Sequence, residues 1–409
     1  MKVLIVSQYF WPENFHINDV AKTLGKKGHH VEVLTGKPNY PRGVIFDGYK
    51  SFGLQSETHS GNVIHRIPIL ARGHNAFRLA LNYLSFVLSG LFFSSWLLRR
   101  NFFNVIFVYC PSPILQAIPA IFLGWTKGIP VVLWIQDQWP ESLSGTGYIK
   151  NIAILKLVEY IVRFIYRNAD LLLVQSQALI EPVTRLASNT PVKYYPNSVD
   201  QIFSKPATTS LPNMDGLTSG FSVMFSGNIG SAQAVDVIIE TASLLQEYTD
   251  IHFVVLGDGS RRDWMLQEVI NRDLSNFHMP GSFPLEVMPG FMQKASAMLV
   301  TLASNEPFST TIPSKIQAYM AAGRPILASL NGEGARLVVE AEAGLAVPAE
   351  DSKALAASVL TLYKMPLIER ERLGNNGSNY YKENFNHEKL LVELINSFKK
   401  IVQKREEYS

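Results

Sequence analysis

The stretch of sequence that decides the fold is TTIPSKIQAYMAAGRPILAS, residues 310–329. A polar loop leads to Pro313, which suits the first turn of a helix because it lacks an N–H that would go unpaired there. The helical run ends at an Ala-Ala-Gly turn, and Pro325–Ser329 then reads as a buried strand. A loop, a helix and a strand in this order predict one unit of a doubly wound α/β domain.

The same stretch carries groups that suit a diphosphate. Three hydroxyls and one ammonium gather at the predicted start of the helix, where free N–H groups and the positive end of the helix dipole favour an anion. This site would hold a diphosphate without a metal. The residues concerned are Thr310, Thr311, Ile312, Pro313, Ser314 and Lys315.

Outward from this stretch, the chain alternates short β-branched or aromatic segments with helical patterns, which predicts parallel sheets covered on both faces. In the first half the predicted strands are Val3–Ser7, Val31–Leu34, Val63–Ile67, Val105–Tyr109, Val131–Trp134, Leu171–Gln175 and Val192–Tyr195. In the second half they are Ser222–Phe225, His252–Leu256, Phe277–Met279, Ala297–Leu302, Pro325–Ser329 and Leu345–Val347.

This pattern predicts two doubly wound domains that face each other across a cleft, as the 409-residue length also indicates. We expect an N-terminal domain over residues 1–198, a linker over 199–220 rich in Pro, Ser, Thr and Gly, and a second domain over 221–386. Residues 387–409 read as an amphipathic helix. The single cysteine, Cys110, excludes an intrachain disulfide framework and fits a reducing compartment.

Charge is distributed unevenly between the halves. Residues 1–198 carry 19 Lys and Arg against 10 Asp and Glu, a net +9, whereas residues 199–409 carry 18 against 24, a net −6. A basic first half predicts contact with an anionic membrane surface. We see no interleaving of basic and aromatic residues that would indicate nucleic-acid binding.

An apolar stretch of 20 residues without charge, Leu79–Leu98, is long enough to span a membrane. Its polar stripe and its position between two strands of one sheet argue against spanning. Two interpretations stay open: a buried core helix, or a monotopic helix with Phe92, Phe93, Trp96, Leu97 and Leu98 in the lipid interface. Ile152–Arg167 has a similar character, and there a basic solvated face over a core face is favoured.

Several loops at predicted strand ends carry residues of chemical interest. Gly227 and Gly230 follow one strand and Gly257 and Gly259 follow the next, so that backbone N–H groups could approach an anion. Acidic and polar groups follow strands of the first half. Gln136 and Asp137 suit a general base or a hydroxyl acceptor, although a helix N-cap or a structural ion pair is the commoner role of a single Asp. Asn14 and His16 suit an acceptor substrate, and His16 could instead cap a helix. No spacing of His and carboxylates indicates a metal site.

Taken in order, these residues resemble the retaining glycosyltransferase family 4, which has the GT-B fold. The resemblance extends over nearly the whole chain and is greatest to enzymes that build surface polysaccharide on polyprenyl diphosphate, including N-acetyl-L-fucosaminyltransferases of O-antigen synthesis. The segments that carry it are Gly28–Thr35, Asp137–Ser142, Pro196–Asp200, Gly227–Gly230, Gly257–Gly259, Gly323–Ile326, Gly332–Glu333 and Ala343–Pro348.

The resemblance implies that a UDP-sugar binds the second domain, with Gly281, Ser282 and Phe283 near the base, and that a lipid-linked saccharide binds the first. It implies transfer with retention and without a metal, and a last helix that crosses back onto the first domain. It also implies a peripheral location on the inner face of the bacterial cytoplasmic membrane, where polysaccharide-assembly enzymes would be partners. Two rivals remain: a UDP-sugar 2-epimerase on the same fold and a non-catalytic membrane-bound partner of an assembly complex.

The chain departs from the family at its diphosphate-binding residues. Many members have an Arg and a Lys where this chain has Asn228 and Gln233, and two Glu where it has Thr310 and Ala318. The resemblance therefore leaves Lys315 and backbone amides to hold the diphosphate.

Overall fold

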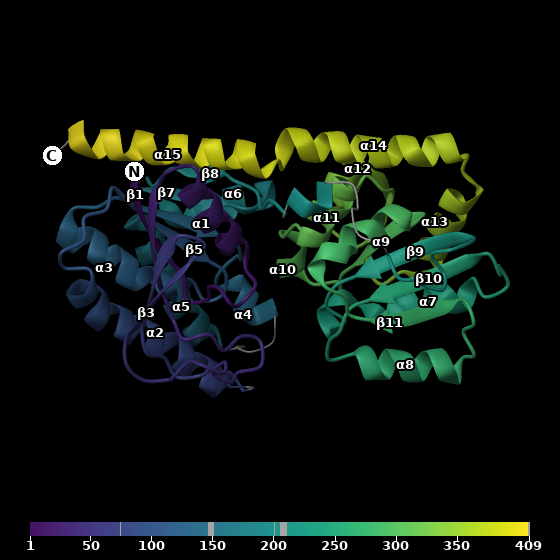
Figure 1. Ribbon diagram of the computed structural model, residues 1–409, viewed down its shortest axis with the longest axis horizontal. Helices are drawn as coiled ribbons and strands as arrows, with labels where there is room; N and C mark the ends of the chain where they lie inside the picture. Colours follow the sequence, from purple (N-terminus) through teal and green to yellow (C-terminus); the bar gives the residue numbers. More distant parts are fainter. Residues whose placement is uncertain (74, 146–150, 200, 205–210, 408–409) are drawn as a thin grey trace. The chain divides into compact units, whose positions relative to one another are not determined.

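The computed structural model describes residues 1–73, 75–145, 151–199, 201–204 and 211–407, and the chain divides into two compact units (Figure 1). Unit 1 comprises Met1–Asn197 and Glu388–Ser409, and unit 2 comprises Ser198–His387. Unit 2 is therefore inserted in the sequence between the two parts of unit 1.

Unit 1 is built on an eight-stranded sheet with the order β3-β4-β2-β1-β5-β6-β7-β8. All neighbouring strands are parallel except β3 and β4. The strands are β1 (Lys2–Val6), β2 (His30–Thr35), β3 (Gln55–His59), β4 (Asn62–Arg66), β5 (Val105–Cys110), β6 (Val131–Ile135), β7 (Leu171–Val174) and β8 (Val192–Tyr194).

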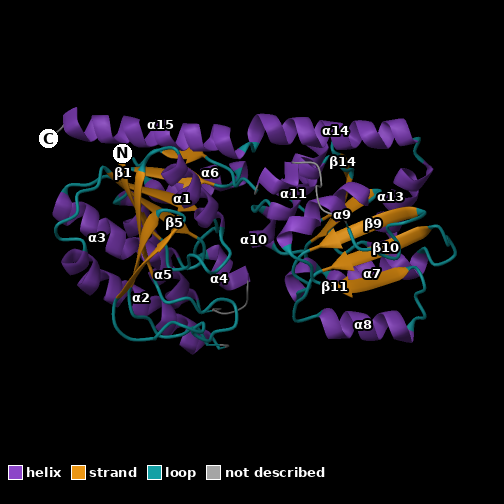
Figure 2. Cartoon of the chain, viewed as in Figure 1, coloured by secondary structure: helices purple, strands orange, loops and turns teal. Residues whose placement is uncertain are grey.

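Helices cover both faces of this sheet, as Figure 2 shows. They are α1 (His16–Lys26), α2 (Ala76–Leu97), α3 (Ala117–Lys127), α4 (Glu141–Gly145), α5 (Ile152–Arg167), α6 (Ile180–Ala187) and α15 (His387–Glu407), with short 3₁₀ helices at Ile114–Gln116 and Gln177–Leu179. Alternation along β1 divides the core, because Leu4 and Val6 pack under α2, α3 and α5 while Val3 and Ile5 pack under α1 and α15.

Unit 2 is built on a six-stranded parallel sheet with the order β11-β10-β9-β12-β13-β14. The strands are β9 (Phe221–Ser226), β10 (Ile251–Leu256), β11 (Phe277–Gly281), β12 (Ala297–Thr301), β13 (Ile326–Ser329) and β14 (Gly344–Val347). The strand order reverses between β9 and β12, which is where doubly wound sheets open a crevice at their carboxyl edge.

Helices again cover both faces of the second sheet. They are α7 (Val235–Leu244), α8 (Arg262–Asn271), α9 (Met288–Lys294), α10 (Glu306–Ser309), α11 (Ser314–Ala322), α12 (Glu333–Glu340), α13 (Ser352–Lys364) and α14 (Leu367–Asn384), with 3₁₀ helices at Gln201–Ser204, Ser231–Gln233 and Leu285–Val287. Two hydrophobic clusters, one on each face, bury the strands almost completely.

The predicted fold class is confirmed: each unit is a doubly wound α/β domain. Every predicted strand is present with its bounds shifted by at most two residues. Strand β3 was not predicted, because its sequence QSETH lacks the apolar alternation of a strand. It lies at the edge of the sheet, where it pairs with β4.

The segment expected to be a linker, 199–220, differs from that expectation in its described part. Val199 and Met214 are buried in a core cluster of unit 2, with Leu211 and Leu217 packed against it. Apolar side chains spaced through the Pro- and Ser-rich stretch hold it against the domain. Residues 200 and 205–210 of the predicted linker lie outside the described residues.

Helix α2 combines the two interpretations left open by the sequence. Phe86 and Asn82 are buried, and the amide of Asn82 donates to the Leu70 carbonyl at 2.6 Å and accepts from Gln8 at 2.7 Å. The opposite face is exposed. Of the five residues that the second interpretation placed in the lipid interface, Phe92 and Trp96 are exposed. Phe93 and Leu97 pack on the core and Leu98 is buried, so the prediction was wrong for these three.

Candidate functional site

The strongest candidate site lies in unit 2 at the carboxyl ends of β9 and β12, where the strand order reverses. A cavity of about 240 Å³ opens there, between the end of β12 and the start of α11. Among the described residues that line it, Lys315 alone carries a charge. The lining residues are Gln233, Val300, Thr301, Leu302, Phe308, Thr311, Pro313, Ser314 and Lys315.

Lys315 is held in an unusual environment. Its Nζ lies 3.6 Å from the centroid of the Phe225 ring and is buried without a hydrogen-bond partner. Burial lowers the pKa of this ammonium from 10.5 to about 7. A buried cation without a counter-charge is unfavourable in the free protein. An anion at this position would complete the missing interactions.

The position of Lys315 follows from the packing of α11. One turn further along the helix, the buried Tyr319 hydroxyl donates to the Ser226 carbonyl at 3.2 Å and accepts from the Ser226 N–H at 3.0 Å. This pair fixes α11 to the end of β9. Helical spacing then places Lys315 over the Phe225–Gly227 turn.

Gly227 is required for this arrangement. A Cβ at this position would lie 2.8 Å from Cε and 3.3 Å from Nζ of Lys315, and the backbone has φ +128°, which side chains rarely adopt. The glycine that ends β9 thus provides the space that the ammonium occupies.

The glycine loops after β9 and β10 were expected to present free amides to an anion, and the structure differs. The Gly227 N–H donates to the Leu256 carbonyl at 2.9 Å, and the Gly257 N–H donates to the Gly281 carbonyl at 2.9 Å. The Gly259 N–H donates to the Asp258 carboxylate at 2.8 Å. Because these three donors are already used, the N–H groups of Gly227, Gly257 and Gly259 are not available to a diphosphate in this conformation.

The reason for the glycines is instead the close approach of the two loops. A Cβ on Gly257 would lie 1.9 Å from the Gly227 carbonyl oxygen, and one on Gly259 would lie 2.3 Å from the Ile229 carbonyl oxygen. No side chain fits at either position. The two loops therefore pack backbone against backbone, which gives both of them a fixed shape.

The two positions at which the family resemblance implied cations form a neutral pair. The Asn228 side-chain amide donates to Gln233 Oε1 at 3.2 Å, and the Gly230 N–H donates to the same oxygen at 3.2 Å. The Gln233 carbonyl in turn accepts from the Thr301 hydroxyl. This network orders the loop but brings no positive charge, so the ammonium of Lys315 has no neighbour of like charge within it.

The loop before α11 supplies hydroxyls. Thr310 and Thr311 each donate to the Pro307 carbonyl at 3.1 Å, which leaves their oxygens able to accept. Ile312 is buried in the core, and Pro313 is the N-cap of α11, whose start has no side-chain cap. Ser314 is exposed at the first helical position.

The residues expected near the nucleotide base occupy the turn after β11. Ser282 is exposed, while the Phe283 ring packs on the Phe291 ring with centroids 4.9 Å apart. Neither lines the 240 Å³ cavity. The Gly281 carbonyl connects this turn to the glycine loops by accepting the Gly257 N–H.

In unit 1, the predicted catalytic pair lies at the carboxyl end of β6. The Asp137 carboxylate accepts from the Ser112 N–H at 3.1 Å and from the Ser112 hydroxyl at 2.9 Å. Burial raises the pKa of Asp137, and these two hydrogen bonds oppose the rise. Gln136 is buried, and its Nε2 has no hydrogen-bond partner. One oxygen of Asp137 thus orders the loop after β5, and the other has no hydrogen bond to the described residues.

Asn14 and His16, the predicted acceptor residues, lie in and just after the loop that follows β1. Asn14 is exposed, and His16 is the first residue of α1. The adjacent Glu13 is buried and accepts from the N–H groups of Asn39 at 2.8 Å and Tyr40 at 2.7 Å. Burial raises the pKa of Glu13 to about 7. Its carboxylate joins the loops after β1 and β2.

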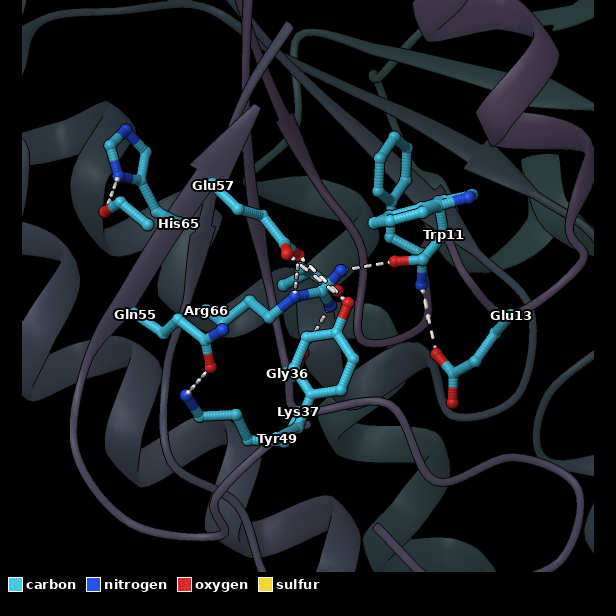
Figure 3. A network of polar contacts seen from close by, with 12 residues as sticks. Trp11, Glu13, Gly36, Lys37, Tyr49, Gln55, Glu57, His65 and Arg66 are labelled. Atoms are coloured by element: carbon cyan, nitrogen blue, oxygen red, sulfur yellow. Dashed lines mark hydrogen bonds and ion pairs between the residues drawn. The ribbon is translucent and has the colours of Figure 1, made fainter. Parts of the chain in front are cut away.

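A second buried charge supports the same loops, as Figure 3 shows. The guanidinium of Arg66, at the end of β4, donates to the carbonyls of Gly36 at 3.1 Å and Trp11, pairs with Glu57, and lies 4.8 Å from the Tyr49 ring centroid. This network was not predicted from the sequence. The signal was present, because Asn62, Ile64 and Arg66 share the inward face of a strand by alternation.

Nearby, Lys37 is almost fully buried and donates to Gln55 at 3.2 Å. Burial, and then the positive charge of Arg66, lower its pKa. Within the described part of the chain, no group of three or more His, Cys, Asp or Glu side chains could hold a metal ion.

Two family models of known proteins match the chain. Residues 14–198 match the family model described as "Glycosyl transferase 4-like domain", and residues 220–365 match "Glycosyl transferases group 1". The chain belongs to the glycosyltransferases with the GT-B fold.

Among curated proteins, the chain is 24% identical over 347 residues to the colanic acid biosynthesis glycosyl transferase WcaI of Escherichia coli (strain K12), covering 79% of this chain and 82% of the relative. Among solved structures it is similar to sucrose-phosphate synthase from Thermosynechococcus elongatus, with a TM-score of 0.76 and 15% identity. The match covers 98% of this chain and 99% of the synthase chain. It is also similar to HepE of Anabaena in complex with UDP, with a TM-score of 0.70 and 14% identity. This match covers 98% of this chain and 100% of the HepE chain.

Proposed function

We propose that this glycosyltransferase moves a sugar from a UDP-sugar to a lipid-linked saccharide during the synthesis of a surface polysaccharide. The observation that carries the proposal is the buried, unpartnered ammonium of Lys315 in the cavity of unit 2. A nucleoside diphosphate supplies the negative charge that this site lacks. The name of the E. coli relative, which refers to colanic acid, supports a polysaccharide product.

In this proposal Lys315 stabilises the diphosphate as it leaves. When the bond between the anomeric carbon and the diphosphate oxygen breaks, negative charge grows on the diphosphate, and a fixed cation in a low-dielectric site favours that change. The hydroxyl oxygen of Thr311, which lines the cavity, and the uncapped N-terminus of α11 add polar groups at the same place. We propose that these groups make a metal unnecessary.

The acceptor would bind unit 1, where the carboxyl end of the sheet carries Asp137, Asn14 and His16. The free oxygen of Asp137 would accept a hydrogen bond from the acceptor hydroxyl, while Gln136 would orient it. We propose transfer with retention of the anomeric configuration, by analogy with family 4. The transferred sugar would be N-acetyl-L-fucosamine or a related N-acetylhexosamine, and the enzyme would work at the inner face of the cytoplasmic membrane beside other assembly enzymes.

A screen of UDP-sugars tests this proposal. Each donor is incubated with the full-length protein and a membrane extract that contains polyprenyl-diphosphate saccharides, and transfer of label into lipid is measured. We expect transfer from at least one N-acetylated donor, and its loss in Lys315→Met. Conversion of a free UDP-sugar without acceptor would favour a 2-epimerase, and donor binding without transfer would favour a non-catalytic partner.

A further inference from the structure

Helix α2 leaves one long face without a partner. Five large apolar side chains point away from the core at spacings of seven, four, four and four residues, which place them along one side of a helix. Leu88 is 66% exposed and Phe92 is 74% exposed. The five are Phe77, Leu84, Leu88, Phe92 and Trp96.

The exposed face continues over the two neighbouring helices. Helices α2, α3 and α5 lie on the same side of the unit 1 sheet and share one buried cluster (Figures 1 and 2). On α3, Trp125 is exposed and meets Phe164 of α5 with ring centroids 5.8 Å apart. We call this three-helix face the apolar surface. Its members outside α2 are Phe122, Trp125, Ile152, Ile154, Leu157, Tyr160 and Phe164.

Basic residues accompany the apolar surface. Residues 76–100, 117–127 and 152–167 carry seven Lys and Arg but a single acidic residue, Glu159. The Arg99 guanidinium lies 5.2 Å from the Trp96 ring centroid at the end of α2. Lys156, Arg163 and Arg167 are exposed on α5. A surface of large apolar side chains with cations beside them matches the boundary between acyl chains and anionic headgroups.

The fold decides how α2 can meet a membrane. By length and composition, Phe77–Leu97 of α2 could cross a membrane, but 33% of its most apolar 18-residue stretch is buried in the protein. It also connects β4 and β5, which belong to the same sheet. Spanning would require those strands to lie on opposite sides of a bilayer, so α2 meets lipid with one face only.

We propose that the apolar surface of α2, α3 and α5 docks on an anionic lipid bilayer, with α2 lying parallel to the membrane plane. Two of the seven cations are already engaged, because Arg163 pairs with Glu159 and Lys127 donates to carbonyls at the end of α2. Charge complementarity of the other five selects lipid as the occupant over an apolar protein groove, because these exposed cations would be desolvated against a protein but are solvated by headgroups. Trp96, Trp125 and Tyr160 are residue types that favour the interfacial region. This inference rests on the proposed function, because a lipid-linked acceptor is what would bring the protein to a membrane.

Binding to vesicles tests the proposal with the full-length protein and neither donor nor acceptor, so that it can fail or succeed independently of sugar transfer. Co-sedimentation is measured with vesicles of phosphatidylcholine alone and of phosphatidylcholine with phosphatidylglycerol. We expect binding to the anionic vesicles that weakens as salt rises from low to high concentration. Equal binding to both kinds of vesicle, or none, would overturn the proposal.

Two pairs of variants locate the binding surface. We expect Leu88→Ser with Phe92→Ser to weaken vesicle binding about tenfold or more, since two apolar side chains no longer leave water. The matched control is Ile270→Ser with Ile368→Ser, whose parent side chains are 71% and 73% exposed in unit 2 and should not contribute.

For the charge component, we expect Arg99→Gln with Arg100→Gln to weaken binding about fivefold per charge. Lys353→Gln with Lys382→Gln, at exposed positions of unit 2, removes the same charge and should leave binding unchanged. Circular dichroism confirms that each variant is folded. Binding that survives the Leu88 and Phe92 changes, or a lipid-free dimer that these changes dissociate, would refute lipid as the occupant.

Discussion

Replacing Lys315 by Met should change ligand affinity and stability in opposite directions. Met keeps an unbranched apolar stem beside Gly227 but removes the charge. A hydrogen bond to a charged group contributes about 1.5–3 kcal/mol. The loss of this contact should therefore weaken UDP binding by about 10- to 100-fold.

The free protein should become more stable in the same variant. The ammonium is buried without a hydrogen-bond partner, and its removal relieves a penalty of about 1–3 kcal/mol. Loss of the contact with the Phe225 ring, at 3.6 Å, offsets about 0.5–1 kcal/mol of this gain. A net gain near 1 kcal/mol should raise the melting temperature of unit 2 by about 2–4 °C.

Isothermal titration calorimetry with UDP measures the affinity, and thermal unfolding without ligand measures the stability. Lys353→Met provides the control, because Lys353 is exposed on α13 of the same unit and should change neither quantity. UDP affinity equal to that of the parent protein would refute the placement of the diphosphate at Lys315. A lower melting temperature would refute the claim that its ammonium is strained in the free state.

The pKa of Lys315 is about 7 in the free protein, and a bound diphosphate should raise it. UDP binding should therefore take up protons above pH 7 and weaken as pH rises. Calorimetry in buffers of different ionisation enthalpy measures this proton uptake. Gly257→Ala should lower the urea midpoint more than Gly281→Ala, since only the first Cβ meets a carbonyl oxygen, at 1.9 Å. Leu394→Ala, at a fully buried position on the inner face of α15, should lose about 2–5 kcal/mol of unfolding free energy, whereas Val392→Ala at an exposed position of the same helix should lose little.

The repeating architecture could be predicted from the sequence because each central strand is a continuous apolar run. Val131–Ile135 and Leu171–Val174, for example, are buried on both faces, and no other element type accounts for such short apolar segments between helices. The polar edge strand Gln55–His59 could not be predicted in the same way, since its pairing depends on β4 and not on its own composition.

The candidate site was predictable in its location but not in its environment. The loop and helix at Thr310–Lys315 predict an anion site by local rules alone. The burial of the Lys315 ammonium depends on Phe225 and Gly227, which lie about ninety residues earlier in the chain and meet it only in the folded sheet. The glycine turns show the same limit, because a sequence does not reveal whether a loop amide is already bonded to a neighbouring loop.

The position of α15 has a consequence for the order in which the protein folds during synthesis. Leu391, Leu394 and Phe398 cover part of one face of a sheet whose strands all lie before residue 198, and α1 covers another part. The part under α15 therefore stays open to solvent until residue 398 has been synthesised. Unit 2 is continuous in sequence and can form earlier on the ribosome. A nascent chain stopped anywhere before α15 would therefore expose an apolar sheet face, which makes premature termination a route to aggregation and to recognition by chaperones.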